Sequence, residues 1–285
     1  MREMSFDFQS RRSMVMGRRG MVAASNPLAS QAGLDVLRRG GTAADAAVAA
    51  AAMLNVTEPA STGIGGDMFA LYYDAKTGEV TALNGSGRAP EALTLEVLAA
   101  QGISGAMPER SPHAVTVPGA ARGWEDLLRR HGRMTLADVL QDAIHYASEG
   151  FPVHPVFGAA WGSPAVEAFL QRSPHTEEYL PNGRAPRVGQ VVRLPGLAET
   201  FRQVAEGGAN AFYNGPIADA IVRTLNRLGS VMTHEDLKAH HSTWETPISI
   251  DYHGVTILEC PPNGQGLAAL MAMGIASGLD LAALA

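Results

Sequence analysis

The spacing of apolar residues predicts two helices near the N-terminus, separated by a pair of glycines. Asn26-Pro27 opens a helix over 28–39, with apolar residues recurring on one side, and Gly40-Gly41 ends it. Thr42 can cap a second helix over 43–54, which is alanine on almost every side. Because a helix with small apolar residues all round is usually buried and closely packed, the pattern places this second helix at the centre of the fold.

Shorter β-type runs predict one isolated strand and two hairpins. The strand is 20–25. The first hairpin pairs 68–74 with 79–84 through a linker that ends in Gly78, and glycine tolerates the positive φ such a linker needs. The second hairpin pairs 247–252 with 255–260, with His253-Gly254 at its turn.

Amphipathic spacing predicts further helices over the rest of the chain, and one of them has a capping signature. They cover 93–101, 124–130, 136–149, 165–171, 197–206, 217–228 and 266–278. Thr233, followed by two acids, resembles the start of a short capped helix.

The stretch Glu58–Pro90 organises these elements and contains the first candidate binding residues. Its sequence, EPASTGIGGDMFALYYDAKTGEVTALNGSGRAP, places a glycine-rich loop before the first hairpin and Ser86 and Arg88 at the hairpin's exit. A pliable loop beside one basic side chain predicts the rim of a site for a small anionic or amide-bearing ligand. The alternative is a tight helix-to-sheet junction with a solvated arginine, and this stretch alone favours the junction.

Composition and charge narrow the class of protein. The chain has 285 residues with a net charge of −6, and a nucleic-acid-binding protein would need a clustered basic face instead. Lys76 and Lys238 are its only lysines, which leaves few candidates for a catalytic lysine. A single cysteine, Cys260, excludes an internal disulfide and a cysteine-based zinc site, and its place before two prolines predicts a buried thiol at a strand end.

The N-terminal residues 1–20 read as a polar, arginine-bearing arm. They contain no apolar segment typical of a secretory signal. No apolar run in the chain approaches the ~18 residues that a membrane helix needs. These features predict a cytoplasmic protein that does not interact with a membrane.

Common cofactor and catalytic motifs are absent. The glycines at 63 and 65 do not fit a dinucleotide fingerprint, because Met68 stands where a further glycine is required and a helix precedes them. The chain has no phosphate-binding Gly-Lys-Ser/Thr run and no HExxH motif, and Gly85-Ser86-Gly87 lacks the outer glycines of a nucleophile elbow. His234, His240 and His241 lie in a polar linker, which predicts a solvated surface rather than a metal site. No cofactor or metal is therefore predicted, and no self-contained catalytic set is evident.

Several ordered blocks of this sequence resemble the γ-glutamyltranspeptidase family of N-terminal-nucleophile hydrolases. The first block is MVAASNPLASQAGLDVLRRGGTAADAAVAAAAMLNVTEPASTGIGGDMFALYYDAKTGEVTALNGSGRAP, and VTVPGAARGW, THEDLKAHHSTWETPISIDYHGVTI and PPNGQG follow it. The resemblance covers roughly residue 20 onwards. It implies a γ-glutamyl acyltransferase or amide hydrolase whose precursor cuts itself into a large and a small subunit, and whose new N-terminal threonine is the nucleophile.

The resemblance implies that the nucleophile lies outside this chain. The family's threonine sits in a Thr-Thr-His-like motif downstream of PPNGQG, and this chain has no Thr-Thr pair. Thr233 belongs to the start of a helix and is not assigned as the nucleophile. We therefore expect no catalytic residue in the chain, which would supply a wall of the pocket for a small amide substrate. Its partner would be the small subunit of the same precursor, and homo-oligomerisation is left open.

The candidate substrate-binding residues are Arg88 and, more weakly, Ser86. In γ-glutamyl transferases proper an arginine before Ala-Pro pairs with the substrate's α-carboxylate, and counting back from Ala89-Pro90 places that arginine on Ser86. Arg88, displaced by two positions, can still offer a bidentate carboxylate clamp from a different backbone point. The alternatives are a structural Arg88, a cephalosporin-acylase-like or oxamate-type amidohydrolase, and a truncated, non-catalytic binding module. The turn 65–67 is interpreted as a packing turn.

The fold class that the resemblance implies is α+β: the αββα sandwich of N-terminal-nucleophile hydrolases, only partly present in this chain. The expected organisation is an arm over 1–20, followed by the N-terminal portion of a large subunit over 21–285. Because the missing portion would supply much of the second sheet, we expect an apolar face to be left uncovered.

Overall fold

The structure is a computed structural model that describes residues 13–108 and 110–280. The helices up to residue 150 are α1 Pro27–Arg38, α2 Ala43–Thr57, α3 Leu95–Ala100, α4 Ala120–His131, α5 Leu136–Val139 and α6 Gln141–Glu149. The later helices are α7 Pro155–Trp161, α8 Pro164–Arg172, α9 Pro195–Gly207, α10 Asn210–Tyr213, α11 Pro216–Arg227, α12 His234–Lys238 and α13 Gly266–Ser277. The strands are β1 Phe69–Asp74, β2 Glu79–Asn84, β3 Phe151–Pro152, β4 Val191–Val192, β5 Thr243–Glu245, β6 Ile248–Tyr252 and β7 Val255–Glu259.

Both predicted hairpins are present, and the first is part of a larger sheet. β1 and β2 pair antiparallel, and β5 joins the other edge of β2 with Thr243 opposite Asn84. β6 and β7 form a separate antiparallel pair. Its turn places both His253 and Gly254 at positive φ, 53° and 80°, which matches a tight hairpin turn. The short strands β3 and β4 form a third small sheet.

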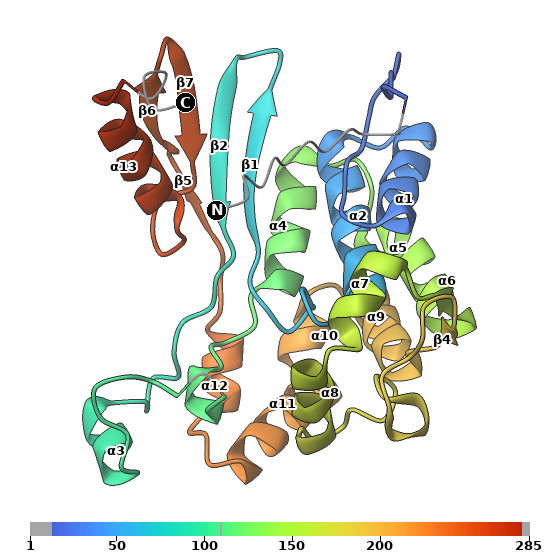
Figure 1. The fold of residues 1–285 in the computed structure, drawn as a ribbon, viewed down its shortest axis with the longest axis vertical. Coiled ribbons are helices and arrows are strands. Elements are labelled where there is room, and N and C mark those ends of the chain that lie inside the picture. Colours follow the sequence, from blue (N-terminus) through green and yellow to red (C-terminus); the bar gives the residue numbers. More distant parts are fainter. Residues whose placement is uncertain (1–12, 109, 281–285) are drawn as a thin grey trace, which may run out of the picture.

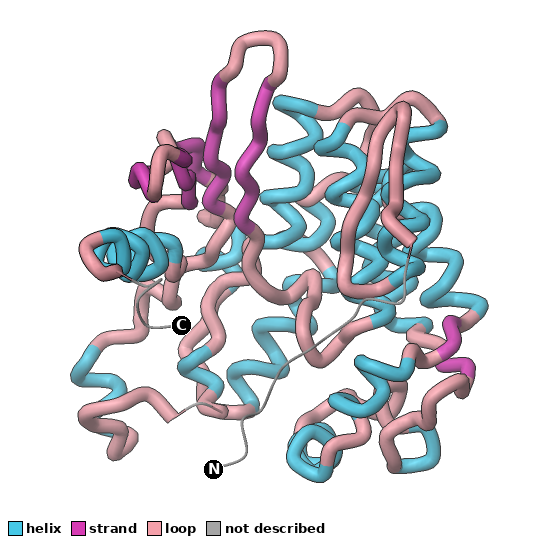
Figure 2. The backbone as a smooth tube through the Cα atoms, turned by 45° about the horizontal axis from the view of Figure 1, so that its top comes forward, coloured by secondary structure: helices cyan, strands magenta, loops and turns pink. Residues whose placement is uncertain are grey.

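The layers follow the order expected of an αββα sandwich. From left to right, Figure 1 shows α13, the β6–β7 hairpin, the β1–β2–β5 sheet and then α4 with the bulk of the helices. In the rotated view of Figure 2 the long β1–β2 hairpin again stands between the short strands and the bulk of the helices. The fold is therefore α+β, as expected, and this chain holds part of the sandwich. Among the described residues, no helix is long and apolar enough to cross a membrane.

Helix α2 lies at the centre of the helical layer. Its N-terminus is a capping box, in which the Thr42 Oγ1 accepts from the Asp45 N–H and the Asp45 carboxylate accepts from the Thr42 N–H. Asp45 is fully buried and also accepts from the backbone N–H groups of Arg133 at 3.0 Å and Met134 at 3.2 Å. One carboxylate thus caps α2 and holds the loop after α4 against it. The predicted central helix is confirmed.

The two faces of the three-stranded sheet differ sharply. The inner face packs on α4: Tyr72 stacks on His131 with ring centroids 3.8 Å apart, and Trp244 meets the same ring edge-on at 5.4 Å. Burial, followed by the charge of Arg130, lowers the pKa of His131 and favours a neutral ring in this contact. The outer face carries three exposed apolar side chains on β1, namely Phe69, Leu71 and Tyr73.

Helix α13 is apolar on nearly every side, yet Leu270 is its only buried residue. It contacts β6 and β7. Exposed apolar side chains cover much of its remaining surface: Leu267, Met271 and Ile275. With the outer face of β1, this is the uncovered apolar area that the partial fold leads us to expect.

Two predicted elements were wrong. Residues 20–25 are not a strand, because no described segment pairs with them; Val22 instead packs against the helical core. The predicted helix 136–149 divides at Leu140 into α5 and α6. The carbonyl oxygen of Asp138, which a continuous helix would use internally, accepts a hydrogen bond from the Arg39 side chain at 2.9 Å.

Candidate functional site

A pocket of about 730 Å³ opens where the exit of β2 meets the segment between α12 and β5 and the loop before α13. Both predicted binding residues, Ser86 and Arg88, line it. The complete lining is Asn84, Ser86, Gly87, Arg88, Ala89, Glu91, Val117, Asp236, Ala239, His240, His241, Thr243, Glu245 and Asn263. The hairpin exit therefore lies on a cavity, together with residues far from it in sequence.

Close backbone contacts hold the β2 exit in place. The Val117 N–H donates to the Arg88 carbonyl oxygen at 2.9 Å. A Cβ atom on Gly87 would lie 1.5 Å from the Val117 oxygen, and one on Gly119 would lie 1.7 Å from the Gly85 oxygen. Only glycine fits at these two positions, because any side chain would separate the two segments. The glycines around Ser86 thus serve the approach of segment 117–119.

The turn at Gly66-Asp67 completes this backbone arrangement. The Gly66 carbonyl oxygen accepts from the N–H groups of Gly119 at 2.9 Å and Ala120 at 3.0 Å, at the start of α4. The Asp67 Oδ1 accepts from the Gly87 N–H at 3.2 Å. All of these contacts are within the protein, which agrees with the interpretation of the turn as a packing element.

Ser86 belongs to a small polar cluster with two asparagines. Its N–H donates to the Asn84 Oδ1 at 3.0 Å, and its Oγ accepts from the Asn263 Nδ2 at 2.7 Å. The Asn84 Nδ2 donates to the Asn263 Oδ1 at 3.2 Å. The sequence signalled Ser86 but not its partner Asn263, because the two residues lie 177 positions apart.

Arg88 is exposed and makes no ion pair with any residue that the structure describes. The pocket's Asp236 is already engaged, since it accepts from the backbone N–H groups of Glu91 and Thr233, both at 2.8 Å. Burial opposes ionisation of this carboxyl, but hydrogen bonds from Glu91 and Thr233 outweigh it and lower the pKa of Asp236. The guanidinium of Arg88 thus remains available to a ligand.

Thr233 is the N-cap of α12 and has its hydroxyl engaged there. Its Oγ1 donates to the Asp236 Oδ2 at 2.7 Å and accepts from the Asp236 N–H at 3.2 Å, completing a capping box. The predicted capped helix is confirmed. This engagement agrees with the decision not to assign Thr233 as a nucleophile.

His240 differs from the prediction of a solvated histidine cluster. Its ring is half-buried and stacks on Tyr213, with centroids 5.5 Å apart, and its Nε2 is buried without a hydrogen-bond partner among the described residues. Burial, followed by the nearby His241 and Arg122, lowers the pKa of His240. The sequence suggested a polar linker because Tyr213, which covers this ring, comes from a distant helix. Among the described residues no group of three histidine, cysteine or acidic side chains can hold a metal ion.

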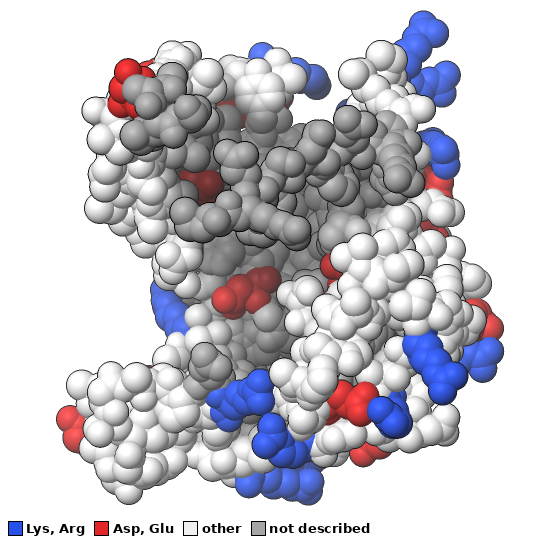
Figure 3. All heavy atoms as spheres, in the orientation of Figure 1, with Lys and Arg blue, Asp and Glu red and all other residues white. Residues whose placement is uncertain are grey.

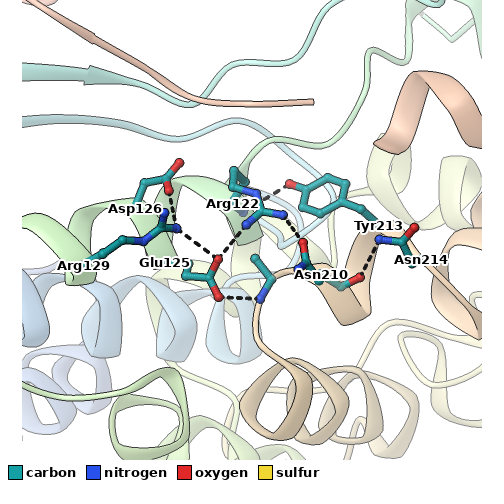
Figure 4. Close-up of polar contacts among 8 residues, drawn as sticks. Arg122, Glu125, Asp126, Arg129, Asn210, Tyr213 and Asn214 are labelled. Atoms are coloured by element: carbon teal, nitrogen blue, oxygen red, sulfur yellow. Dashed lines mark hydrogen bonds and ion pairs between the residues drawn. The ribbon is translucent and has the colours of Figure 1, made fainter. Parts of the chain in front are cut away.

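Tyr213, whose ring stacks on His240 of the pocket, belongs to a polar network with Arg122, Glu125 and Asn210, and Figure 4 shows this network. The Tyr213 hydroxyl donates to the Pro118 carbonyl oxygen at 2.8 Å and accepts from the Arg122 N–H at 3.2 Å. The Arg122 guanidinium pairs with Glu125 at 2.6 Å and donates to the Asn210 Oδ1 at 2.5 Å. Burial raises the pKa of Tyr213, which keeps its hydroxyl protonated as the donor to Pro118.

Cys260 follows β7 and is half-buried, with its Sγ 3.7 Å from the Ala70 carbonyl oxygen. Burial, followed by the charges of Glu259 and Glu245, raises the pKa of Cys260. A raised pKa disfavours the thiolate, which supports a structural thiol rather than a nucleophile.

The surface in Figure 3 carries basic and acidic side chains on the same face.

Comparison with known proteins identifies the family. The family model described as gamma-glutamyltranspeptidase matches residues 29–285. This chain belongs to the γ-glutamyltranspeptidase family. The family assignment agrees with the ordered blocks of the sequence and with the layer order of the fold.

Three relatives show which branches of the γ-glutamyltranspeptidase family this chain is similar to. It is 40% identical to the glutathione hydrolase-like YwrD proenzyme of Bacillus subtilis, over 93% of this chain and 50% of the relative. It is 38% identical to the oxamate amidohydrolase proenzyme of Klebsiella pneumoniae, over 92% of this chain and 50% of the relative. The crystal structure of cephalosporin acylase from Bacillus halodurans matches with a TM-score of 0.89 and 44% identity, over 97% of this chain and 52% of that one. The chain thus spans about half the length of these relatives.

Proposed function

We propose that this chain supplies the substrate-pocket wall of an N-terminal-nucleophile amidohydrolase or γ-glutamyl acyltransferase, whose threonine nucleophile is encoded beyond residue 285. The observation that carries the proposal is the pocket at the β2 exit. Ser86 and Arg88 line this pocket, and Arg88 has no ionic partner among the described residues. An unpaired guanidinium on a cavity suits a carboxylate or another oxygen acceptor of the substrate.

The proposed reaction proceeds through an acyl-enzyme. The threonine Oγ attacks the carbonyl carbon of the substrate amide while its own α-amine takes the hydroxyl proton. The C–N bond then breaks, and the leaving amine departs with that proton. Water or an acceptor amine next attacks the acyl-enzyme, which releases the acid or the transfer product and regenerates the threonine. In this scheme Arg88 and Ser86 hold the acyl group through hydrogen bonds and take no part in proton transfer.

Within this proposal we favour an amidohydrolase of the cephalosporin-acylase or oxamate type. In γ-glutamyl transferases proper an arginine stands at the position that Ser86 occupies in this chain. The residue that binds the carboxylate of the acyl group therefore differs from the one in those transferases. The similarity to a cephalosporin acylase and to an oxamate amidohydrolase supports the same direction. Cleavage of glutathione-type γ-glutamyl amides remains the alternative, which the similarity to a glutathione hydrolase-like proenzyme supports.

The proposed partner is the small subunit of the same precursor, docked on the uncovered apolar area. Two of the relatives are named proenzymes, and this chain spans half the length of each. The exposed face of β1 and the exposed side of α13 are the surfaces that such a partner would cover. The arm over 1–20, a cytoplasmic location and homo-oligomerisation stay predictions of the sequence. A truncated binding module stays the non-enzymatic alternative.

Replacing Arg88 in the full-length precursor tests the proposal. We expect Arg88→Ala to raise KM for carboxylate-bearing amide substrates about 10- to 100-fold, because a charged hydrogen-bond pair is lost. Arg88→Lys should recover only part of the loss, since lysine cannot form the bidentate contact. Arg223→Ala, an exposed arginine of α11 outside the pocket, is the matched control.

Two results would contradict the proposal in different ways. Turnover by Arg88→Ala that stays within error of the parent for γ-glutamyl and simple amide substrates would remove Arg88 from the site. A full-length protein that neither cleaves itself nor turns over any amide would favour the binding module.

A further inference from the structure

In the cluster formed by Asn84, Ser86 and Asn263, the hydrogen bonds determine which side-chain atoms donate and which accept. The starting point is the Ser86 backbone N–H, which can only donate, and it donates to the Asn84 side chain at 3.0 Å. The atom of Asn84 that receives this bond must be its oxygen. The amide nitrogen of Asn84 is therefore the group that faces Asn263.

The same reasoning orients the second asparagine. The Asn84 Nδ2 donates at 3.2 Å, so the atom of Asn263 that it meets is the oxygen Oδ1. This leaves the Asn263 Nδ2 facing the Ser86 Oγ at 2.7 Å, where it donates. Although the oxygen and nitrogen of an asparagine side chain are hard to tell apart by shape, here a backbone donor fixes both amides.

These assignments leave the Ser86 hydroxyl group with a proton that it can donate. Its oxygen already accepts from Asn263, and no described residue accepts its proton. Ser86 is half-buried on the pocket wall, two residues before Arg88, which can only donate. The hydroxyl and the guanidinium therefore present donors to the same cavity.

We propose that Asn84 and Asn263 set Ser86 as a hydrogen-bond donor, so that the pocket selects acyl groups with an acceptor oxygen, a carboxylate or a carboxamide oxygen, at this point. The proposal rests on the proposed function of the pocket. In it Ser86 is a specificity-determining residue that touches the substrate. Asn263 is a positioning residue that acts through Ser86.

The experiment compares two substrates of the full-length enzyme, whose acyl groups have equal length and end in a carboxylate or in a methyl group. We expect Ser86→Ala to raise KM about tenfold for the carboxylate substrate and to leave the methyl substrate unchanged. Asn263→Asp keeps the shape of the side chain but replaces the donor by an acceptor. The Ser86 proton would then turn to the introduced carboxylate, and KM for the carboxylate substrate should again rise about tenfold.

A double variant separates this effect from the added negative charge. If Asn263 acts through Ser86, the double variant S86A/N263D should be no worse than S86A alone. Asn182→Asp is the matched control, since Asn182 is exposed and does not line the pocket. If N263D does not yield folded protein, Asn263→Ala removes the donor without adding charge, and non-additivity with S86A is expected there as well.

Each other outcome overturns a different statement. If N263D raises KM by the same factor in the parent enzyme and in the S86A variant, the added negative charge alone causes the effect. That result would overturn the positioning role of Asn263. Equal shifts for both substrates would mean a structural effect rather than recognition of an oxygen. Impairment by Arg88→Ala with normal S86A and N263D would overturn only this inference. Normal turnover in all three variants would overturn the assignment of this pocket to the acyl group of the substrate.

Discussion

Helices α2 and α13 have nearly the same kind of sequence and opposite surroundings. Both are apolar on almost every side, with no polar face that would mark a boundary with water. Eleven of the fifteen residues of α2 are buried, whereas α13 buries only Leu270 among its twelve. A helix of this composition needs cover on all sides. The difference shows that the described chain is complete around α2 and leaves α13 open.

The same contrast extends to the two faces of the β1–β2–β5 sheet. The inner face is filled by α4 through Tyr72, His131 and Trp244, while the outer face exposes Phe69, Leu71 and Tyr73. The candidate pocket lies at the end of this sheet, where Asn84 of β2 and Thr243 and Glu245 of β5 line it. Its wall is anchored to the packed side through the backbone contacts of segment 117–119 at the start of α4.

The largest effect is expected from removing the anchor of α2. Asp45→Ala should lower the free energy of unfolding by about 4 kcal/mol, because it removes a cap and leaves the buried N–H groups of Arg133 and Met134 without an acceptor. Chemical denaturation of the purified protein measures the loss. Asp138→Ala is the matched control: it opens the capping box at Thr135, which holds no remote loop, and should cost about 1 kcal/mol. Equal losses in the two variants would contradict the anchoring role.

The next effect compares one substitution in the two helices directly. Met53→Ala, at a fully buried position of α2, should cost about 3 kcal/mol through lost contacts and a cavity. Met271→Ala, at a position of α13 that is 59% exposed, should stay within about 0.5 kcal/mol when residues 1–285 are measured alone. Thermal unfolding of both variants tests the pair. A large loss from Met271→Ala would mean that α13 is already covered in this chain.

The smallest effect on stability is expected from a charge on the open side of α13. Ile275→Glu should change the free energy of unfolding of residues 1–285 by no more than about 0.5 kcal/mol, because this side chain is 71% exposed. It should nevertheless abolish co-purification with the separately expressed remainder of the precursor, since the interface would bury the charge. Val156→Glu, at an exposed position of α7, is the control. Unimpaired co-purification of Ile275→Glu would place the partner elsewhere.

The local elements of the fold were largely predictable because their signals are local. The period of apolar residues gave α1, α2, α9, α11 and α13, and the Gly78 and His253-Gly254 turns gave both hairpins. The failures concern contacts with distant residues. Arg39 donates to the Asp138 carbonyl oxygen beside the break between α5 and α6, and residues 20–25 have no strand to pair with among the described residues.

The candidate site divides in the same way. The chain sequence by itself placed Ser86 and Arg88 at a hairpin exit beside glycines, because turn chemistry and charge are written in consecutive residues. Only the tertiary structure decided that Asn263 would donate to Ser86, that Tyr213 would cover His240, and that Ser86, His240 and Asn263 would line one cavity. Such contacts join segments tens to hundreds of residues apart, and they depend on how whole layers pack rather than on any local pattern.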